Sequence, residues 1–303
     1  MFSVKKLYSD IDLELSMYPS FVSALFVRKD NAWIKIAGYN LGAILKETRN
    51  TLSCKGCSEE AFKEWTGLWF NPFEHLNEIG YKSKTIFKII NSYRELRIIV
   101  SSFDRPFILV LTFLSRNTDY HRNVRRWARY LFNSLESFET NTIKRRLNTI
   151  KSQSYQLRQL HEILESLSDI DFKKNPWKLR RELMEIKYIG PKVVDAFLLF
   201  SKYDTIFTPS DIHLRRFATR LRLINDKELI VPSKKQCLEY DAYCPQCPLR
   251  EKCITGFFNL MYGHLSGFIQ TIAYVHDSLW CSKNKCNVCP FRDICLNRNM
   301  IVK

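Results

Sequence analysis

The sequence is poor in the features that mark fibrous, low-complexity or membrane-spanning chains. Its 303 residues include 9 glycines and 10 prolines, too few for a collagen-like or low-complexity protein. Long apolar runs are also missing: Phe107–Leu111 extends to Leu114 only through Thr112, and a membrane-spanning helix needs roughly 20 residues. Met1–Ser9 does not join a basic stretch to an apolar one, as a secretory signal would. We therefore expect an intracellular protein without membrane contact.

Acidic residues are scarce relative to basic ones. The chain has 31 aspartates and glutamates against 47 lysines and arginines, a formal net charge of +16 at pH 7. Such an excess repels itself, and a bound polyanion offsets that repulsion. Two groups of basic residues at near-helical spacing are interleaved with aromatic side chains: Arg122, Arg125, Arg126 and Arg129, and Lys173, Lys174, Lys178, Arg180 and Arg181. We expect nucleic acid as the partner, at the nucleoid or in the nucleus. The alternative is a generally basic protein.

The hydrophobic pattern divides the chain into a short sheet-forming part and a long helical part. With 46% hydrophobic residues, the chain can bury a sizeable core, which argues against disorder. Alternating segments at 11–15, 24–27 and 32–36 predict strands of a small antiparallel sheet. From Ser58 onward the period approaches 3.6 residues, which predicts helices at 59–70, 107–114, 123–135, 142–167, 175–186, 191–201 and 257–280. The expected fold class is α+β, mainly α, with a sheet-containing domain at 1–85, a helical core at 86–230, and a C-terminal helix with cysteine-rich loops at 231–303.

Cysteine, by contrast, is abundant, with 10 residues. Eight of them form two tetrads, Cys237, Cys244, Cys247 and Cys253, and Cys281, Cys286, Cys289 and Cys295, and segments 244–253 and 286–295 repeat in register. The four cysteines of a zinc ribbon are usually spread over a longer stretch, whereas a compact loop can wrap an iron–sulfur cubane. We expect a [4Fe–4S] cluster in the first tetrad and prefer one in the second; zinc and disulfides are the alternatives. Cys54 and Cys57 form a separate CxxC, expected to be free thiols or a local disulfide.

Residues 175–201 predict two helices joined by a tight hairpin. Asn175 and Pro176 are a favourable helix start, and Gly190-Pro191 opens the second helix. The free N–H groups at such a start can bind a phosphate without reading sequence. Lys192 falls in the first turn, where the helix dipole favours the neutral amine, a nucleophile suited to Schiff-base chemistry. The alternative is a surface lysine that contacts phosphate.

Three motifs carry a resemblance to a known family. The run Gly190–Asp195 (Gly-Pro-Lys-Val-Val-Asp), followed by Pro-Ser-Asp-Ile-His at 209–213, resembles the helix-hairpin-helix DNA glycosylase superfamily, most closely the 8-oxoguanine DNA glycosylases. The first cysteine tetrad has the spacing of the endonuclease III iron–sulfur loop. The turn at 114–118 resembles the one that inserts an asparagine beside the evicted base. The chain departs from the family at Tyr188, where the hairpin usually has its first glycine, and in having a second tetrad.

The resemblance implies a base-excision-repair DNA glycosylase and AP lyase that flips a damaged base, expected to be oxidised and similar to 8-oxoguanine, out of duplex DNA. Lys192 would attack the sugar carbon C1′ and form a Schiff base, and Asp211 would stabilise the cationic sugar. Asn117 would fill the hole in the duplex, and the other residues expected to contact DNA are Arg116, Lys187, Ile189, Gly190 and His213. We expect a monomer.

Two other functions stay open. A monofunctional glycosylase would use Asp211 to activate water, with Lys192 only binding, and would release the base without cutting the strand. A non-catalytic iron–sulfur protein would bind DNA or sense redox state, with the clusters holding a basic surface together. Which lesion is removed is left undecided by the sequence, because the segment at 18–21, Tyr-Pro-Ser-Phe, lacks the glycine of the Gly-Gln-Ser-Phe motif with which 8-oxoguanine enzymes recognise their base.

Overall fold

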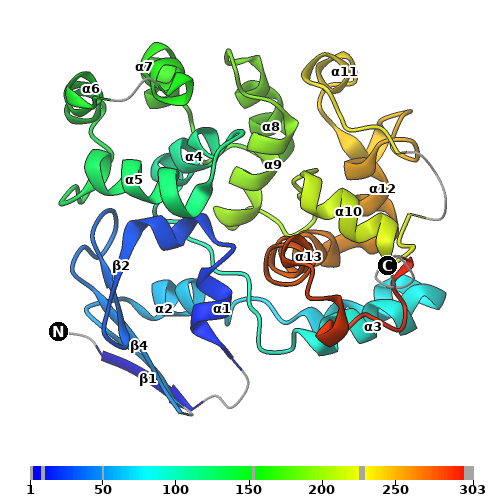
Figure 1. The fold of residues 1–303 in the computed structure, drawn as a ribbon. Helices are drawn as coiled ribbons and strands as arrows, with labels where there is room; N and C mark the ends of the chain where they lie inside the picture. The colour runs from blue at the N-terminus through cyan, green and yellow to red at the C-terminus, as the bar shows by residue number, and fades with distance from the viewer. Residues whose placement is uncertain (1–2, 8–10, 50, 152–153, 225–228, 297–303) are drawn as a thin grey trace.

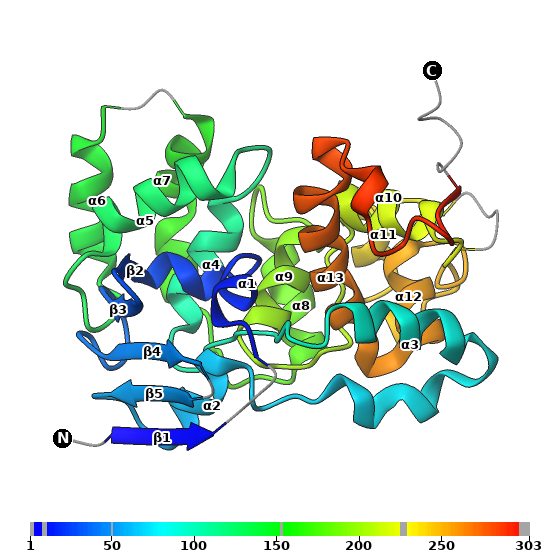
Figure 2. The ribbon, with the colours of Figure 1, turned by 60° about the horizontal axis from the view of Figure 1, so that its bottom comes forward.

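The computed structural model describes residues 3–7, 11–49, 51–151, 154–224 and 229–296. Its N-terminal part contains an antiparallel sheet in the order β1-β5-β4-β3-β2, of which β4, β5 and β1 lie side by side in Figure 2. The strands are β1 (Ser3–Leu7), β2 (Phe26–Lys29), β3 (Ala32–Lys35), β4 (Ile44–Thr48) and β5 (Thr51–Lys55). The sheet confirms the expected α+β, mainly α, fold class.

Helices make up most of the remaining structure. The α-helices are α1 (Leu13–Met17), α2 (Glu59–Thr66), α3 (Ser83–Ser92), α4 (Arg105–Leu114), α5 (Arg125–Phe132), α6 (Thr140–Thr149), α7 (Tyr155–Ser168), α8 (Pro176–Glu185), α9 (Pro191–Phe200), α10 (Ile212–Arg220), α11 (Lys234–Glu239), α12 (Ile254–Tyr262) and α13 (Ser266–Leu279). The 3₁₀-helical segments are η1 (Phe21–Leu25), η2 (Pro72–Lys82), η4 (Cys244–Gln246), η5 (Gly263–Leu265), η6 (Cys281–Lys283) and η7 (Cys286–Val288), and η3 (Tyr120–Val124) is a π-helical turn.

The sequence prediction is wrong at the first segment. Residues 11–15 alternate as a strand would, but Leu13–Met17 is helix α1. Asp12 caps this helix, because its Oδ1 accepts the N–H of Leu15 at 2.8 Å. The helix then buries Leu13 and Met17 on one face. Two other early boundaries also differ: 24–27 becomes a strand only from Phe26, and the helix predicted at 59–70 ends at Thr66.

Two long helices of the prediction are each two helices in the structure. The segment 142–167 is divided between α6 and α7, because Ile150 leaves the helical conformation for extended backbone. The segment 257–280 is divided between α12 and α13 by Gly263, whose φ of 48° and ψ of −128° lie in a region that suits only glycine. The predicted helices at 107–114 and on both sides of the hairpin are confirmed.

Helix α4 forms the centre of the fold. Every residue from Phe107 to Leu114 is buried, as expected for a helix that is apolar on all sides. It packs against α7 and α9, so the hairpin between α8 and α9 is held against the core. Figure 1 shows α4 between the sheet and this hairpin. Among the described residues, the structure contains no helix with both the length and the apolar character needed to cross a membrane.

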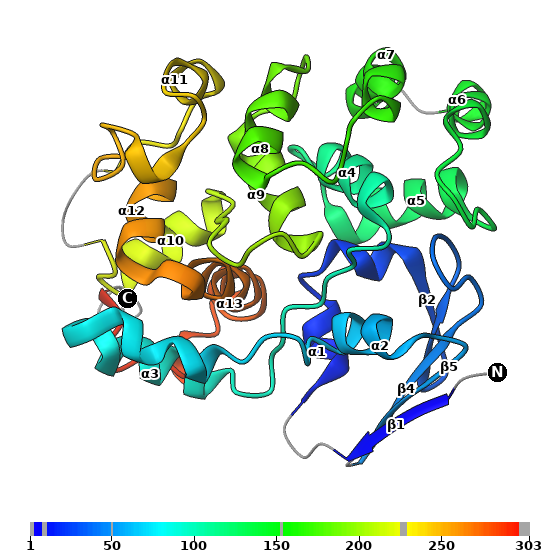
Figure 3. The same cartoon turned by 180° about the vertical axis from the view of Figure 1, so that it is seen from behind.

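Helix α3 lies beside the C-terminal part of the chain (Figures 1 and 3). The Lys88 ammonium pairs with the Asp293 carboxylate, and a hydrogen bond of 2.9 Å joins Tyr93 Oη to His276 Nδ1. A segment from the first third of the chain therefore supports α13 and the loop that follows it. The domain boundaries at 85 and 230 stay predictions; of the C-terminal domain expected at 231–303, residues 297–303 lie outside the described part.

A buried ion pair fastens the sheet to the helical core. Lys35 Nζ, on β3, lies 2.7 Å from Asp104 Oδ2 at the start of α4, and both side chains are fully buried. Ser101 Oγ and the backbone N–H of Tyr39 also donate to the Asp104 carboxylate, so its charge is well satisfied.

Cys54, on β5, and Cys57 form a disulfide, which is one of the two states expected for this CxxC.

Candidate active site

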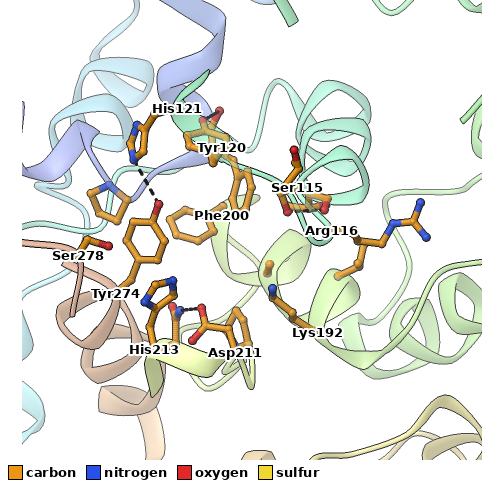
Figure 4. A pocket seen from close by; sticks show the side chains of 18 of the residues that line it. Ser115, Arg116, Tyr120, His121, Lys192, Phe200, Asp211, His213, Tyr274 and Ser278 are labelled. Atoms are coloured by element: carbon orange, nitrogen blue, oxygen red, sulfur yellow. Dashed lines mark hydrogen bonds between the residues drawn. The ribbon is translucent and has the colours of Figure 1, made fainter. Parts of the chain in front are cut away.

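A cavity of about 410 Å³ opens between the N-terminal part, the turn after α4, helix α9 and helix α13. Figure 4 shows its lining side chains from close by. Lys192 and Asp211, the two residues expected to carry the chemistry, both line it, as do the predicted residues Arg116 and His213. The other predicted DNA contacts, Asn117, Lys187, Ile189 and Gly190, belong to the adjoining turn and hairpin.

Lys192 reaches the cavity from the first turn of α9. Pro191 is the first residue of this helix. The first helical hydrogen bond runs from the N–H of Val194 to the carbonyl of Gly190, at 3.2 Å. The Lys192 side chain is exposed, and Figure 4 shows its amine pointing toward the side of the cavity where Asp211 lies. The amine is therefore accessible to a group that enters the cavity.

Asp211 is held in one orientation at the start of α10. Its Oδ1 accepts the backbone N–H of Leu214 at 2.8 Å, which makes it the N-cap of this helix. Its Oδ2 accepts from Gln270 Nε2, on α13, at 3.0 Å. The side chain is only 8% exposed. Two hydrogen bonds thus fix a carboxylate beside the cavity, where it can stabilise a positive charge.

Helix α13 also supplies a carboxylate that orients His213. The His213 Nδ1 donates to Asp277 Oδ2 at 2.7 Å, and Arg216 and Arg220 lie 3.3 Å and 3.5 Å from the same carboxylate. Burial alone would raise the pKa of Asp277, but the hydrogen bond from His213 and the charges of His213 and Arg216 bring it below its ordinary value. Asp277 is therefore ionised at neutral pH, and its hydrogen bond fixes the orientation of His213.

Three rings meet on one side of the cavity. Tyr18 and His121 stack with ring centroids 4.2 Å apart, and a hydrogen bond of 3.2 Å joins His121 Nε2 to Tyr274 Oη. Burial, assisted by the charge of Arg125, lowers the pKa of His121 to about 4, so the ring is neutral at neutral pH. Sequence reasoning missed this group, because its members come from three distant segments and no spacing connects them.

Asn117 lies in the turn after α4, between the cavity residues Arg116 and Thr118. Asn117 is exposed and has φ of 47°, the left-handed conformation that asparagine tolerates better than most residues. Arg116, next to it, turns its guanidinium away from the other lining residues (Figure 4). The exposed position of Asn117 suits a residue that enters a duplex.

The hairpin between α8 and α9 has a tyrosine in a conformation that favours glycine. Tyr188 has φ of 65°, and this is the position where the family's hairpins have their first glycine. The Tyr188 hydroxyl donates to Glu162 Oε2, on α7, at 2.7 Å, and Lys187 Nζ lies 3.1 Å from the same atom. Ile189 is fully buried. Anchoring to α7 and burial of Ile189 hold the hairpin in place despite the strained residue.

The loop of the first cysteine tetrad lies against the helix-hairpin-helix. Arg180, buried on α8, donates from Nε to Asp195 Oδ1 on α9 at 2.6 Å, and from a terminal nitrogen to the carbonyl of Ala242 in the cysteine loop at 2.7 Å. Lys234 Nζ, at the start of α11, donates to the carbonyl of Ile186 in the hairpin at 2.8 Å. The first tetrad is thus fixed to the element expected to bind phosphate.

The loop of the second tetrad is a continuation of α13. Arg220, which pairs with Asp277, also acts on Cys281: burial raises the pKa of this thiol, and the charge of Arg220 opposes the rise. His276 Nε2 lies 3.5 Å from Cys289 Sγ. Since α13 contributes Gln270, Tyr274 and Ser278 to the cavity, the second tetrad is fixed to the wall of the candidate site.

Each loop contains the four thiols that a four-iron cluster would need. All eight cysteines are free thiols, and the backbone N–H of Phe291 donates to Cys289 Sγ at 3.4 Å. Burial raises the pKa of Cys253 and of Cys289, and nearby backbone N–H groups oppose that rise. Within the described part of the chain, no group of three histidine, cysteine or acidic side chains closes around a single metal ion. A four-iron cluster takes one cysteine at each of four irons, so its cysteines need not converge on one point.

Comparison with known proteins finds its matches among solved structures. No protein-family model matches the sequence, and no curated protein matches it. The 8-oxoguanine glycosylase/lyase of Clostridium acetobutylicum, in complex with double-stranded DNA containing cytosine opposite 8-oxoguanine, is similar with a TM-score of 0.63 and 15% identity over 94% of this chain and 99% of its own. The 3-methyladenine DNA-glycosylase of Archaeoglobus fulgidus is similar with a TM-score of 0.60 and 15% identity, over 92% and 99%. The chain therefore has the fold of the helix-hairpin-helix DNA glycosylases.

Proposed function

We propose that this protein is a DNA glycosylase with AP-lyase activity, which removes a damaged base from duplex DNA through a Schiff base on Lys192. The observation that carries the proposal is that Lys192 and Asp211 line one cavity, the first exposed to it and the second fixed beside it by two hydrogen bonds. The fold supports the proposal, since an 8-oxoguanine glycosylase/lyase bound to DNA has it.

The proposed reaction uses the amine as nucleophile and the carboxylate as electrostatic partner. Lys192 Nζ forms a bond to C1′ of the flipped nucleotide while the bond from C1′ to the base nitrogen breaks, and the base leaves with a proton. The fixed Asp211 carboxylate stabilises the positive charge that develops on the sugar. The amine passes one proton to the leaving base, and opening of the sugar ring, with O4′ taking a proton from solvent, then gives the protonated Schiff base. Removal of a proton from C2′ then expels the 3′-phosphate, and the strand is cut.

The bound DNA is proposed to be a duplex with an oxidised base similar to 8-oxoguanine. The hairpin from Ile186 to Gly190 would hold a phosphate through free N–H groups at the start of α9, and Lys187 and His213 would supply further contacts with the DNA. Asn117 would occupy the space that the flipped base leaves. The charge of +16 supports binding to a polyanion. We propose that the protein is a monomer and acts at the nucleoid or in the nucleus.

Each cysteine tetrad is proposed to hold one [4Fe–4S] cluster, with Cys237, Cys244, Cys247 and Cys253 as ligands of the first and Cys281, Cys286, Cys289 and Cys295 as ligands of the second. A bound cluster would cross-link its loop through four iron–sulfur bonds. The purified protein should absorb near 400 nm and contain about eight irons per chain. One zinc per tetrad, without this absorbance, would contradict the proposal and make both sites structural zinc sites.

Trapping with borohydride tests the proposed mechanism, because borohydride reduces a Schiff base to a stable covalent bond. Wild-type protein should form a covalent adduct with duplexes that contain an oxidised base. Lys192→Ala should form none while its affinity for DNA stays within about threefold, since one phosphate contact at most is lost. Absence of any adduct with wild-type protein, over a panel of oxidised and alkylated bases, would overturn the lyase proposal.

A monofunctional glycosylase is the second candidate, and it is favoured by the fixed position of Asp211 beside the cavity, which does not depend on Lys192. In that reaction Asp211 would orient a water that attacks C1′. The two candidates differ in their products: the monofunctional enzyme releases the base and leaves an intact abasic strand, and its Lys192→Ala variant keeps the excision activity.

A further inference from the structure

We propose that Arg116 is a positioning residue that holds the turn carrying Asn117 against the hairpin. Binding of the DNA backbone by the hairpin and displacement of a base by the turn are thereby coupled. The turn at 115–119 is called here the probe turn, and the hairpin comprises 186–190. The inference rests on the proposed function. The two segments are far apart in sequence, and the Arg116 side chain joins them directly.

The Arg116 guanidinium uses its three nitrogens on three different elements. Its Nε donates to the carbonyl of Phe113 at the end of α4, at 2.8 Å. One terminal nitrogen donates to the carbonyl of Tyr188 in the hairpin, at 2.9 Å, and the other to Gln159 Oε1 on α7, at 2.8 Å. Its carbon lies 3.8 Å from the centroid of the Phe113 ring. A planar fork can make all these contacts at once, whereas a lysine ammonium cannot.

A side chain of helix α7 also holds the backbone of the probe turn. Gln156 Nε2 donates to the carbonyl of Arg116 at 2.7 Å. The side chain of Arg116 is therefore held by the hairpin and α7, and its main chain by α7 again. Asn117 follows directly, exposed and with positive φ. Because both the side chain and the main chain of Arg116 are held, the direction in which the next residue, Asn117, points is set.

The contact on the hairpin falls on its strained residue. Tyr188, with φ of 65°, directs its carbonyl to Arg116 and its hydroxyl to Glu162. A carbonyl that faced a bound phosphate would repel it, and here the carbonyl faces a cation. The acceptors of Arg116 are neutral oxygens, so its positive charge is not cancelled by a carboxylate among them and stays next to the expected phosphate site.

The consequence is a fixed distance between phosphate and probe. If the hairpin binds a phosphate and Arg116 holds the probe turn against the hairpin, the depth to which Asn117 enters the duplex is fixed relative to that phosphate. Loss of this link would leave both segments folded but free to move separately. Misplacement by about 1 Å can cost about 100-fold in rate. Base displacement should therefore suffer more than DNA binding.

The variant Arg116→Lys tests the coupling, because it keeps the charge and removes the fork. Excision of a damaged base should slow by about 10–100-fold, while the dissociation constant for undamaged duplex changes by less than about threefold. Trapping on a duplex that already contains an abasic site should stay near the wild-type rate, because no base has to be displaced. This last result also shows that the variant is folded. Arg145→Lys, on exposed α6 residue Arg145, is the matched control and should behave as wild type.

Hydrogen–deuterium exchange supplies a readout that needs no enzymatic activity. Undamaged duplex should protect both the probe turn and the hairpin in wild-type protein, and only the hairpin in Arg116→Lys. Excision at the wild-type rate by Arg116→Lys, or equal losses of binding and excision, would overturn the inference. If wild-type protein excises no base, the proposed function fails, and the exchange pattern alone decides whether the two segments are coupled.

Discussion

Asp211 has two roles that one substitution can separate. As N-cap of α10 it stabilises the fold, and as a carboxylate it is proposed to stabilise the sugar cation. Asparagine caps helices as well as aspartate does, and the Gln270 amide can rotate to offer its oxygen to the new amide group. Asp211→Asn should therefore slow base release by at least about 100-fold in single-turnover assays, with little change in the urea midpoint. Asp211→Ala should lose both, and an active Asp211→Asn variant would contradict the assigned role.

His121 gives the stability of the protein a pH dependence of known sign. Burial lowers its pKa in the folded state to about 4 from the 6.5 of an unperturbed histidine, so between these values the unfolded chain binds a proton that the folded chain does not. Its contribution is therefore complete above pH 6.5 and is lost as the pH falls toward 4. His121→Gln should weaken the fall in urea midpoint between pH 6.5 and 4. Equal slopes for variant and wild type would show that the pKa of His121 is the same in the folded and the unfolded chain.

At the scale of elements, the buried pair of Lys35 and Asp104 is one of the contacts that join the sheet to the start of α4. Removing one partner leaves a charge buried without its counter-ion, so Asp104→Ala should lower the free energy of unfolding by about 3–5 kcal/mol. The double variant Lys35→Met, Asp104→Asn contains no unpaired charge. It should be more stable than Asp104→Ala in urea denaturation followed by circular dichroism. If the double variant is instead the less stable of the two, the loss of stability comes from losing the ion pair itself and not from leaving Lys35 buried without a counter-ion.

At the scale of the whole molecule, the net charge of +16 predicts strong dependence of DNA binding on salt. Each phosphate neutralised by the protein releases counter-ions, so affinity falls steeply as salt rises. The dissociation constant for an undamaged duplex should rise by about tenfold or more between 50 and 200 mM salt. Fluorescence anisotropy at several salt concentrations measures the slope. Affinity independent of salt would show that the charge does not face the DNA.

The sequence allowed prediction of the features that short-range signals specify. The hairpin was predictable because Asn175 and Gly190-Pro191 mark helix starts, and Asn175 Oδ1 does accept the N–H of Trp177 at 3.0 Å. Helix α4 was predictable from its continuous apolar run. Residues 11–15 were misassigned because five alternating residues fit a strand or a capped helical turn equally well. That Lys192 and Asp211 share a cavity was expected only from the resemblance, since no local signal connects them.

Long-range contacts explain what the sequence could not reveal. Arg116 reads as one more basic residue near a DNA-binding turn, and only the structure shows its guanidinium on the carbonyl of Tyr188. The stack of Tyr18 and His121 depends in the same way on how the N-terminal part lies against the helical core. Both depend on packing between elements, which neither hydrophobic period nor motif spacing records.

Helix α13 has its cavity residues in a single row. Gln270, Tyr274, Ser278 and, just beyond the helix, Ser282 line the cavity, and they recur every four residues, close to the helical repeat of 3.6. Cys281 belongs to the same stretch. Each inserted or deleted residue would rotate everything beyond it by about 100°. An insertion between Tyr274 and Cys281 would thus turn the second cysteine loop away from Arg220 while leaving the cavity residues before it in register. The number of residues in this helix is therefore as much a requirement of the site as their identity.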